Sequence, residues 1–173
     1  MAAPATGFSL IELLVALVIM AVLSGLLVLS SSGGGVEAQL REQAERLRAR
    51  IEFACERSEL SGRDIGLFLT SGGYGFSERR GDAWELLSRA ELAPYQLRKG
   101  FTLRGETGLL DEDYPEQPQM LCFSSGEHSP LAVLLSAGER NPELRLRADW
   151  NLPIELAERA PGERVWRERG HRP

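Results

Sequence analysis

A single acidic residue interrupts an apolar run near the start of the chain. Glu12 is the only charged side chain between Phe8 and Leu29, and a carboxylate within a membrane helix costs about 2.5–3.5 kcal/mol on insertion scales. A cut after Gly7 would leave a free amine on Phe8 and make Glu12 the fifth residue. In a low dielectric, the carboxylate could then pair with the free amine of a neighbouring subunit. The alternative interpretation is that Glu12 lies near the lipid headgroups and stays hydrated.

The element that must position Glu12 is a long apolar helix. The run from Phe8 to Leu29 has 22 residues, and a helix of this length spans about 33 Å, which exceeds a bilayer core of about 30 Å. The sequence therefore predicts a single transmembrane helix over residues 8–30. A removable secretory signal is the alternative, because Ser30–Ser32 follow the run, but such signals have a basic start, a shorter apolar core and no acid within it.

The rest of the chain has the composition of one globular domain. Hydrophobic residues make up 43% and charged residues 26% of the 173 residues, which excludes a wholly disordered or collagen-like chain. The 20 basic residues against 25 acidic ones give a net charge of −5. This balance argues against nucleic acid as a partner, because phosphate-binding domains normally carry a basic excess.

Residues 31–62 continue as a helix, with an apolar stripe at spacings of three and four. The stripe comprises Leu40, Ala44, Leu47, Ile51, Ala54 and Ser58, and it predicts a helix face packed on a core. The Arg and Glu residues on the other faces are interpreted as solvated neighbours four positions apart. Gly62 is expected to end the helix in the left-handed conformation.

After Arg63 the period changes to two, which is typical of an antiparallel sheet. The predicted strands are Ile65–Thr70, Tyr74–Glu78, Trp84–Leu87, Phe101–Arg104, Gln119–Ser124, Leu131–Leu135 and Glu143–Ala148. Hairpin turns at Ser71–Gly73 and Arg80–Asp82 are predicted to join the first three. In the last strand, Leu144, Leu146 and Ala148 should face the core, with the intervening charged residues facing outward. The predicted fold class is thus α+β, a long N-terminal helix packed on an antiparallel sheet.

The segment Gly7-Phe8-Ser9-Leu10-Ile11-Glu12-Leu13-Leu14-Val15-Ala16-Leu17 resembles the class III signal of type IV pilins and pseudopilins. The resemblance implies that a prepilin peptidase cuts between Gly7 and Phe8 and methylates the Phe8 amine. It also implies a pilin-like organisation. The expected parts are a leader (1–7), a transmembrane helix (8–30), the second half of the N-terminal helix (31–62), a periplasmic β-sheet domain (63–157) and an Arg-rich flexible tail (158–173).

Two further stretches resemble one family within this group. Leu60–Leu67, and Gln117–Gln119 with Phe123–Pro130, are similar to minor pseudopilin H of type II secretion, the GspH family. The resemblance implies a structural subunit near the pseudopilus tip that helps to export folded proteins across the outer membrane. It implies no enzymatic activity and no cofactor. The implied location is the inner membrane, with other pseudopilins, the prepilin peptidase and the assembly platform as partners.

Catalytic and metal sites lack their usual motifs. Ser124 and Ser125 near His128 do not form a G-x-S-x-G elbow, and a turn explains them. Cys55 and Cys122 lie 67 positions apart and form no C-x-x-C ligand pair. They could form one disulfide in an oxidising compartment, or each could be a small buried hydrophobe.

The C-terminal tail carries the alternative function. Trp166 between Arg164 and Arg167 could stack on a base while the guanidiniums hold phosphates. This interpretation makes the chain a FimT-like minor pilin of a type IV pilus that contacts DNA during natural transformation. The interleaved Glu163 and Glu168 argue against it, because binding driven by counterion release needs uncompensated cations. The favoured interpretation is a solvated, frayed terminus, and a basic contact with an acidic neighbouring subunit is a further alternative.

Overall fold

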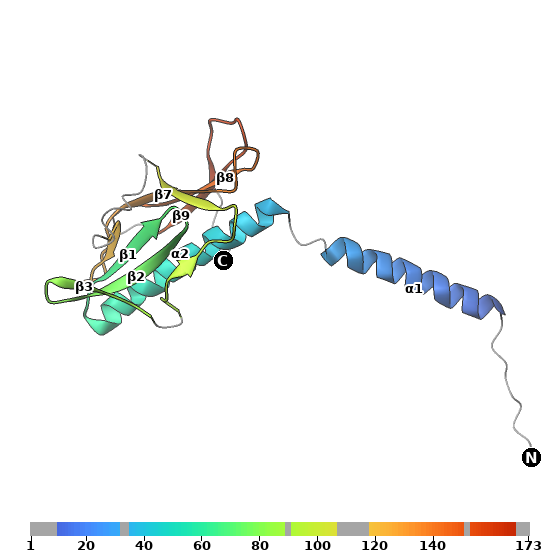
Figure 1. Ribbon diagram of the computed structural model, residues 1–173, viewed down its shortest axis with the longest axis horizontal. Helices are drawn as coiled ribbons and strands as arrows, with labels where there is room; N and C mark the ends of the chain where they lie inside the picture. The colour runs from blue at the N-terminus through green and yellow to red at the C-terminus, as the bar shows by residue number, and fades with distance from the viewer. Residues whose placement is uncertain (1–9, 32–34, 89–90, 107–117, 151–152, 169–173) are drawn as a thin grey trace, which may run out of the picture. The chain divides into compact units, whose positions relative to one another are not determined.

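The computed structural model describes residues 10–31, 35–88, 91–106, 118–150 and 153–168. The chain separates into two compact units, Met1–Gly35 and Val36–Pro173 (Figure 1). The first contains helix α1, and the second, called the domain below, contains helix α2 and the strands β1 to β10.

Helix α1 spans Leu10–Ser31, and its first turn holds Glu12. The side chains from Leu10 to Met20 are exposed within this unit. None of the helices, as far as the described residues go, combines the length and the apolar character that a membrane crossing demands.

Helix α2 spans Val36–Ser61 and buries the predicted stripe. Its buried residues are Leu40, Gln43, Ala44, Leu47, Ile51, Ala54 and Ser58. The predicted helix end is also confirmed, since Gly62 has a φ of 65° and the Arg63 amide donates to the Ser58 carbonyl at 3.3 Å. This pattern is a Schellman cap, and it satisfies a carbonyl that the end of the helix would otherwise leave without a donor.

The first sheet contains five antiparallel strands. They are β1 (Ile65–Thr70), β2 (Gly73–Arg80), β3 (Ala83–Leu86), β4 (Tyr95–Gln96) and β6 (Met120–Cys122). Their order is β3-β2-β1-β6, and β4 also pairs with β2. Two-residue turns join β1 to β2 and β2 to β3, as the sequence predicts, and Gly81 in the second turn has a positive φ of 62°.

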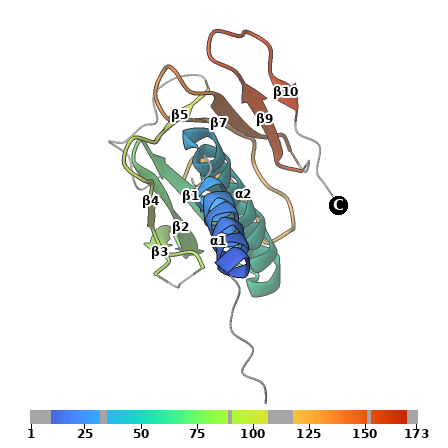
Figure 2. The same cartoon turned by 90° about the vertical axis from the view of Figure 1, so that its right-hand side faces the viewer.

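The second sheet also contains five antiparallel strands, which lie in the order β10-β9-β8-β7-β5. They are β5 (Thr102–Gly105), β7 (Leu131–Ser136), β8 (Glu143–Ala148), β9 (Glu155–Arg159) and β10 (Arg167–Glu168). Figure 2 shows β10 beside β9.

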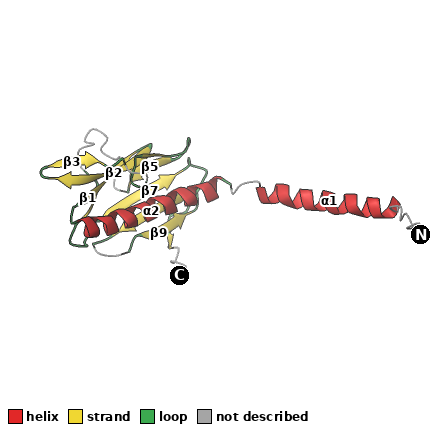
Figure 3. Cartoon of the chain, turned by 90° about the horizontal axis from the view of Figure 1, so that it is seen from below, coloured by secondary structure: helices red, strands yellow, loops and turns green. Residues whose placement is uncertain are grey.

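The core lies where α2 packs against both sheets. The helix contacts β1 and β6 of the first sheet and β7 and β8 of the second, and Figure 3 shows it lying across the strands. The alternation predicted for β8 is confirmed, since Leu144, Leu146 and Ala148 are buried while Arg147 is exposed. Burying one leucine side chain contributes about 1.5–3 kcal/mol, so this shared face is the main source of stability.

Three strands are missing from the sequence prediction, and two of them change its account of the tail. Residues 158 and 159 belong to β9, and Arg167 and Glu168 pair with Glu158 and Ala157. The structure thus places paired strands where the sequence predicted a flexible tail, up to residue 168. The missed strands β4 and β10 have two residues each and β9 lacks β-branched and aromatic residues, so period and propensity gave no signal.

Cys55 of α2 and Cys122 of β6 form a disulfide with their Cα atoms 4.8 Å apart. The Ser58 hydroxyl, one turn further along α2, donates to the Cys122 carbonyl at 2.8 Å. A covalent bond and a buried hydrogen bond therefore fasten the C-terminal half of α2 to the first sheet. Of the two alternatives that the sequence left open, the structure contains the bridge.

The disulfide predicts a redox-dependent stability. Titration of the unfolded, non-reduced protein should find no free thiol. The double variant Cys55→Ala/Cys122→Ala should lose about 4 kcal/mol of unfolding free energy in the chain-entropy model, because the bridge closes a loop of 67 residues. Two titratable thiols, or an unchanged denaturation midpoint in the double variant, would contradict the prediction.

Candidate assembly site

The residues proposed for processing and assembly belong to the N-terminal unit. Gly7 and Phe8 lie outside the described residues. Glu12 is exposed in the first turn of α1, among the exposed apolar side chains of Leu10, Ile11 and Leu13. An exposed carboxylate is open to contact with a cation, and the pairing of Glu12 with a neighbouring subunit stays a prediction.

The three tail residues assigned to DNA have other surroundings in the structure. The guanidinium carbons of Arg145 and Arg159 lie 4.7 and 4.5 Å from the centroid of the Trp166 ring. Arg167 donates to Glu163 at 2.9 Å, and Arg164 is exposed. The aromatic surface that the DNA interpretation needs for a base is in contact with cations of the domain itself.

Arg159, which lies over the Trp166 ring, also binds a carboxylate that joins three strands. Glu143 of β8 accepts a hydrogen bond from Arg104 of β5 at 2.6 Å and another from Arg159 of β9. Burial raises the pKa of Glu143, but the hydrogen bonds and charges of the two arginines outweigh burial and hold the pKa below its ordinary value of 4.5. The outer face of the second sheet is therefore a network of paired charges.

A second carboxylate paired with two arginines, this one buried, lies near the end of β2. The Glu78 side chain is 5% exposed and accepts hydrogen bonds from Arg63 at 3.0 Å and Arg80 at 3.3 Å. Burial raises the pKa of Glu78, and the two arginines more than offset this, so that the net pKa lies below 4.5. Glu78 thereby ties the chain after α2 to the β2–β3 hairpin.

The sequence analysis missed a packing role for an arginine of α2. The Arg50 guanidinium lies 5.1 Å from the Tyr74 ring centroid and 5.8 Å from that of Tyr95. Its Nε donates to the Glu91 carbonyl at 2.8 Å. These partners are at least 24 positions away in sequence, so helical spacing alone suggested a solvated residue.

The Ser124–Ser125 segment is a turn, as the sequence analysis interpreted it. The Phe123 amide donates to the Glu127 carbonyl at 2.8 Å, and Gly126 has a φ of 92°. His128, the base that a catalytic interpretation would use, forms an isolated β-bridge with Cys122. The geometry of the segment is explained by strand connection.

Comparison with known proteins connects both parts of the chain to one group. Residues 4–28 match the prokaryotic N-terminal methylation motif. The type II secretion system protein H of Pseudomonas aeruginosa is 36% identical over 169 residues, which cover 88% of this chain and 97% of that protein. The protein of the same name from Aeromonas hydrophila is 30% identical over 76% of this chain and 80% of its own length.

Solved structures share the fold over 72% of the chain. The minor pseudopilin EpsH from the type 2 secretion system of Vibrio cholerae aligns with a TM-score of 0.56 at 23% identity, over 72% of this chain and 99% of that chain. The solution structure of Escherichia coli GspH aligns with a TM-score of 0.55 at 20% identity, over 72% of this chain and 93% of that chain. These likenesses show the fold.

A helix packed on antiparallel sheets, together with an N-terminal methylation motif, defines the class of pilin-like subunits. Within that class, the chain belongs to the type II secretion system protein H family, since its identity to the Pseudomonas protein extends over nearly all of both sequences. The relatives do not support the FimT-like alternative.

The two arginine-paired carboxylates, Glu78 and Glu143, predict a stability that falls in acid. A pKa that is lower in the folded protein stabilises the fold above the unfolded value, and this contribution is lost as the pH falls through the folded pKa. The unfolding free energy should therefore decrease below about pH 4.5. Glu78→Gln should cost about 1–2 kcal/mol at pH 7 and flatten this decline, as followed by urea denaturation.

Glu52→Gln is the matched control for this experiment. The Glu52 side chain is 52% exposed, and its oxygen lies 3.8 Å from Arg48, so the variant should differ from the parent protein by less than about 0.5 kcal/mol at either pH. An acid decline of the same size in Glu78→Gln and in the parent protein would contradict the assignment.

Proposed function

We propose that the chain is a minor pseudopilin of the type II secretion system, a structural subunit in the tip region of the pseudopilus that helps to export folded proteins across the outer membrane. The observation that carries the proposal is the 36% identity to a type II secretion system protein H over 97% of that protein. The methylation motif at residues 4–28 supports it independently.

In this proposal the N-terminal segment is processed and then anchors the chain. A prepilin peptidase cuts after Gly7 and methylates the Phe8 amine. The apolar run from Phe8 to Leu29 holds the protein in the inner membrane as a single-pass helix, with the C-terminal domain in the periplasm. The disulfide between Cys55 and Cys122 fits this location, because such bonds persist in oxidising compartments.

Glu12 acts in assembly. Its carboxylate pairs with the free amine of a neighbouring pseudopilin, and this charge-assisted hydrogen bond sets the position of one subunit against the next. The inner-membrane assembly platform and the other pseudopilins, major and minor, are the partners. The chain has no enzymatic role and takes no cofactor or metal in this proposal, so the energy for assembly comes from another component.

Processing can be read directly from the mature N-terminus. Mass spectrometry of the protein purified from membranes should find N-methylated Phe8 as the first residue. A Gly7→Val chain should keep its leader, because a branched side chain at the cleaved bond obstructs the peptidase. A mature protein that begins near Ser32 would instead establish a conventional secretory signal and refute the proposal.

The role of Glu12 predicts a loss of assembly without a loss of insertion. Glu12→Ala should enter the membrane at least as well as the parent chain, because removing the charge lowers the insertion cost. Its crosslinking to neighbouring pseudopilins should fall about ten- to a hundredfold, which corresponds to a hydrogen bond to a charged group of about 1.5–3 kcal/mol.

Glu12→Asp is the conservative control for this test. It keeps the carboxylate and should retain more crosslinking than Glu12→Ala, whereas the neutral Glu12→Gln should resemble Glu12→Ala. Normal secretion and normal crosslinking in both neutral variants would refute the pairing.

A further inference from the structure

We propose that the free edge of β3, together with a groove beside it, binds an extended segment from the globular domain of another pseudopilin. The segment adds a strand to the first sheet and inserts an apolar side chain into the groove. This inference rests on the proposed function in one respect, which is that the partner is a pseudopilin. The surface itself belongs to the domain and does not involve Glu12.

The groove, called the β3 groove below, lies on the face of the first sheet that points away from α2. It has a volume of about 640 Å³. Apolar side chains line it, namely Phe68, Trp84, Leu86 and Pro94. Its floor passes over Gly75, where any side chain would meet Leu86 at 3.6 Å and Pro94 at 3.8 Å. These are ordinary contact distances, so a methyl group would fit there, and the glycine makes the groove deeper by that volume.

Along one edge of β3, the backbone pairs with no other strand in the part of the chain that the structure describes. β3 is the last strand in the order of the first sheet. The Leu87 amide donates to the Phe76 carbonyl at 2.8 Å, and Glu85 and Ala83 are the next residues to face β2 by alternation. The amides and carbonyls of Trp84 and Leu86 therefore point away from the sheet. An unpaired strand edge of this kind is a template for another strand.

The side chains of the groove favour an extended segment with a mixed pattern. Leu86 is 59% exposed, which leaves a large apolar surface beside the free edge. Ser77 is 1% exposed, and its buried hydroxyl has no hydrogen-bond partner in the described part of the chain. An incoming segment would cover the Leu86 side chain and supply a hydrogen-bond donor or acceptor to the Ser77 hydroxyl.

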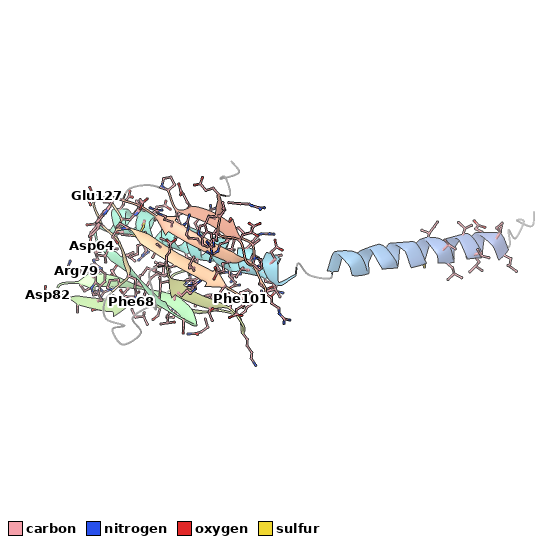
Figure 4. The ribbon with its side chains drawn as sticks, turned by 90° about the horizontal axis from the view of Figure 1, so that it is seen from above. Asp64, Phe68, Arg79, Asp82, Phe101 and Glu127 are labelled. Atoms are coloured by element: carbon pink, nitrogen blue, oxygen red, sulfur yellow. A yellow bond between two sulfur atoms is a disulfide. The ribbon has the colours of Figure 1, made fainter. Side chains whose placement is uncertain are left out.

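The charge at the mouth of the groove adds a further requirement. Asp82 lines the groove, and Figure 4 places it at the outer end of the β2–β3 hairpin, with Phe68 further along the sheet. The Glu85 side chain of β3 is 55% exposed, but it is paired with Arg80 at 3.2 Å, so Asp82 supplies the charge that a partner can complement. The complementary segment therefore carries a Lys or Arg beside its apolar residue.

A second copy of this chain fits the edge less well. Antiparallel pairing of two β3 strands that joins Trp84 of one to Leu86 of the other places the two Glu85 side chains directly opposite each other, each paired with the Arg80 of its own chain at 3.2 Å. Like charges at directly opposed positions destabilise a sheet. The net charge of −5 on each chain opposes this pairing as well. A different pseudopilin with a basic residue in its segment avoids both costs.

The test uses the full-length chain in membranes, expressed with one tagged pseudopilin of the same secretion system at a time. A photo-crosslinking residue replaces the exposed Ala83, which lines the groove. A separate variant carries the crosslinking residue at Val165, which is 68% exposed and precedes β10 of the second sheet. The Ala83 position should crosslink to one pseudopilin, at an extended segment that contains an apolar and a basic residue.

Substitutions then identify the contact. Leu86→Asp should lower the Ala83 crosslink about tenfold, because it removes apolar contact and places a charge against the incoming segment. Leu86→Ser should lower the crosslink by less, because it removes the apolar contact without adding a charge. Val165→Asp is the matched control and should leave the yield unchanged. An unaltered thermal midpoint and an intact disulfide in each variant establish that the domain is folded.

Several results would overturn the inference. They are crosslinks only to a second copy of the chain, no crosslink from Ala83 in correctly processed protein, or an unchanged yield in both Leu86 variants. Failure of the proposed function is distinguishable, because it would appear as an unprocessed N-terminus or a chain missing from the membrane fraction. A processed, membrane-bound chain with a silent Ala83 position refutes the β3 groove alone.

Discussion

The packing of one face of α2 against strands of both sheets is the interaction on which the rest of the domain depends. A five-stranded sheet with one apolar face needs a partner layer, and here a single helix supplies that layer to two sheets. The helix is fastened at both ends. Near its C-terminus, Cys55 is bonded to Cys122 of the first sheet. Near its N-terminus, Arg41 donates to both carboxylate oxygens of Glu158 in the second sheet, at 3.2 and 3.3 Å.

The charges of the domain follow from the same arrangement. All but one of the 20 basic residues are arginines, the exception being Lys99. Arginine suits this fold because a planar guanidinium can stack on an aromatic ring and donate several hydrogen bonds at once. Arg50 does so between α2 and the first sheet, and Arg159 does so between Trp166 and Glu143. These arginines therefore join elements of the domain to one another and do not form a basic surface.

The domain and the N-terminal unit have different physical tasks in the proposed subunit. The exposed surface of α1 is apolar around Glu12, and the proposed pairing with neighbours would depend on that one carboxylate and on the medium around it. The domain instead has a buried core and a surface with many paired charges. The β3 groove is an exposed apolar part of that surface. Separate surfaces of this kind allow assembly and partner choice to change independently.

The sequence by itself determined the features that depend on local spacing. The buried stripe of α2, the Gly62 cap, the two hairpin turns and the alternation of β8 all follow from periods of 3.6 and 2 or from glycine conformation. The family resemblance was equally local, because its residues are consecutive.

Only the tertiary structure decided which distant residues meet. The distribution of strands between two sheets, the joining of Cys55 to Cys122 and the packing of Arg145 and Arg159 on Trp166 depend on contacts far apart in the chain. The short strand β10 forms because β9 offers it an edge, since two residues have no strand preference of their own. Local propensity specifies elements, whereas burial and pairing in three dimensions specify their partners.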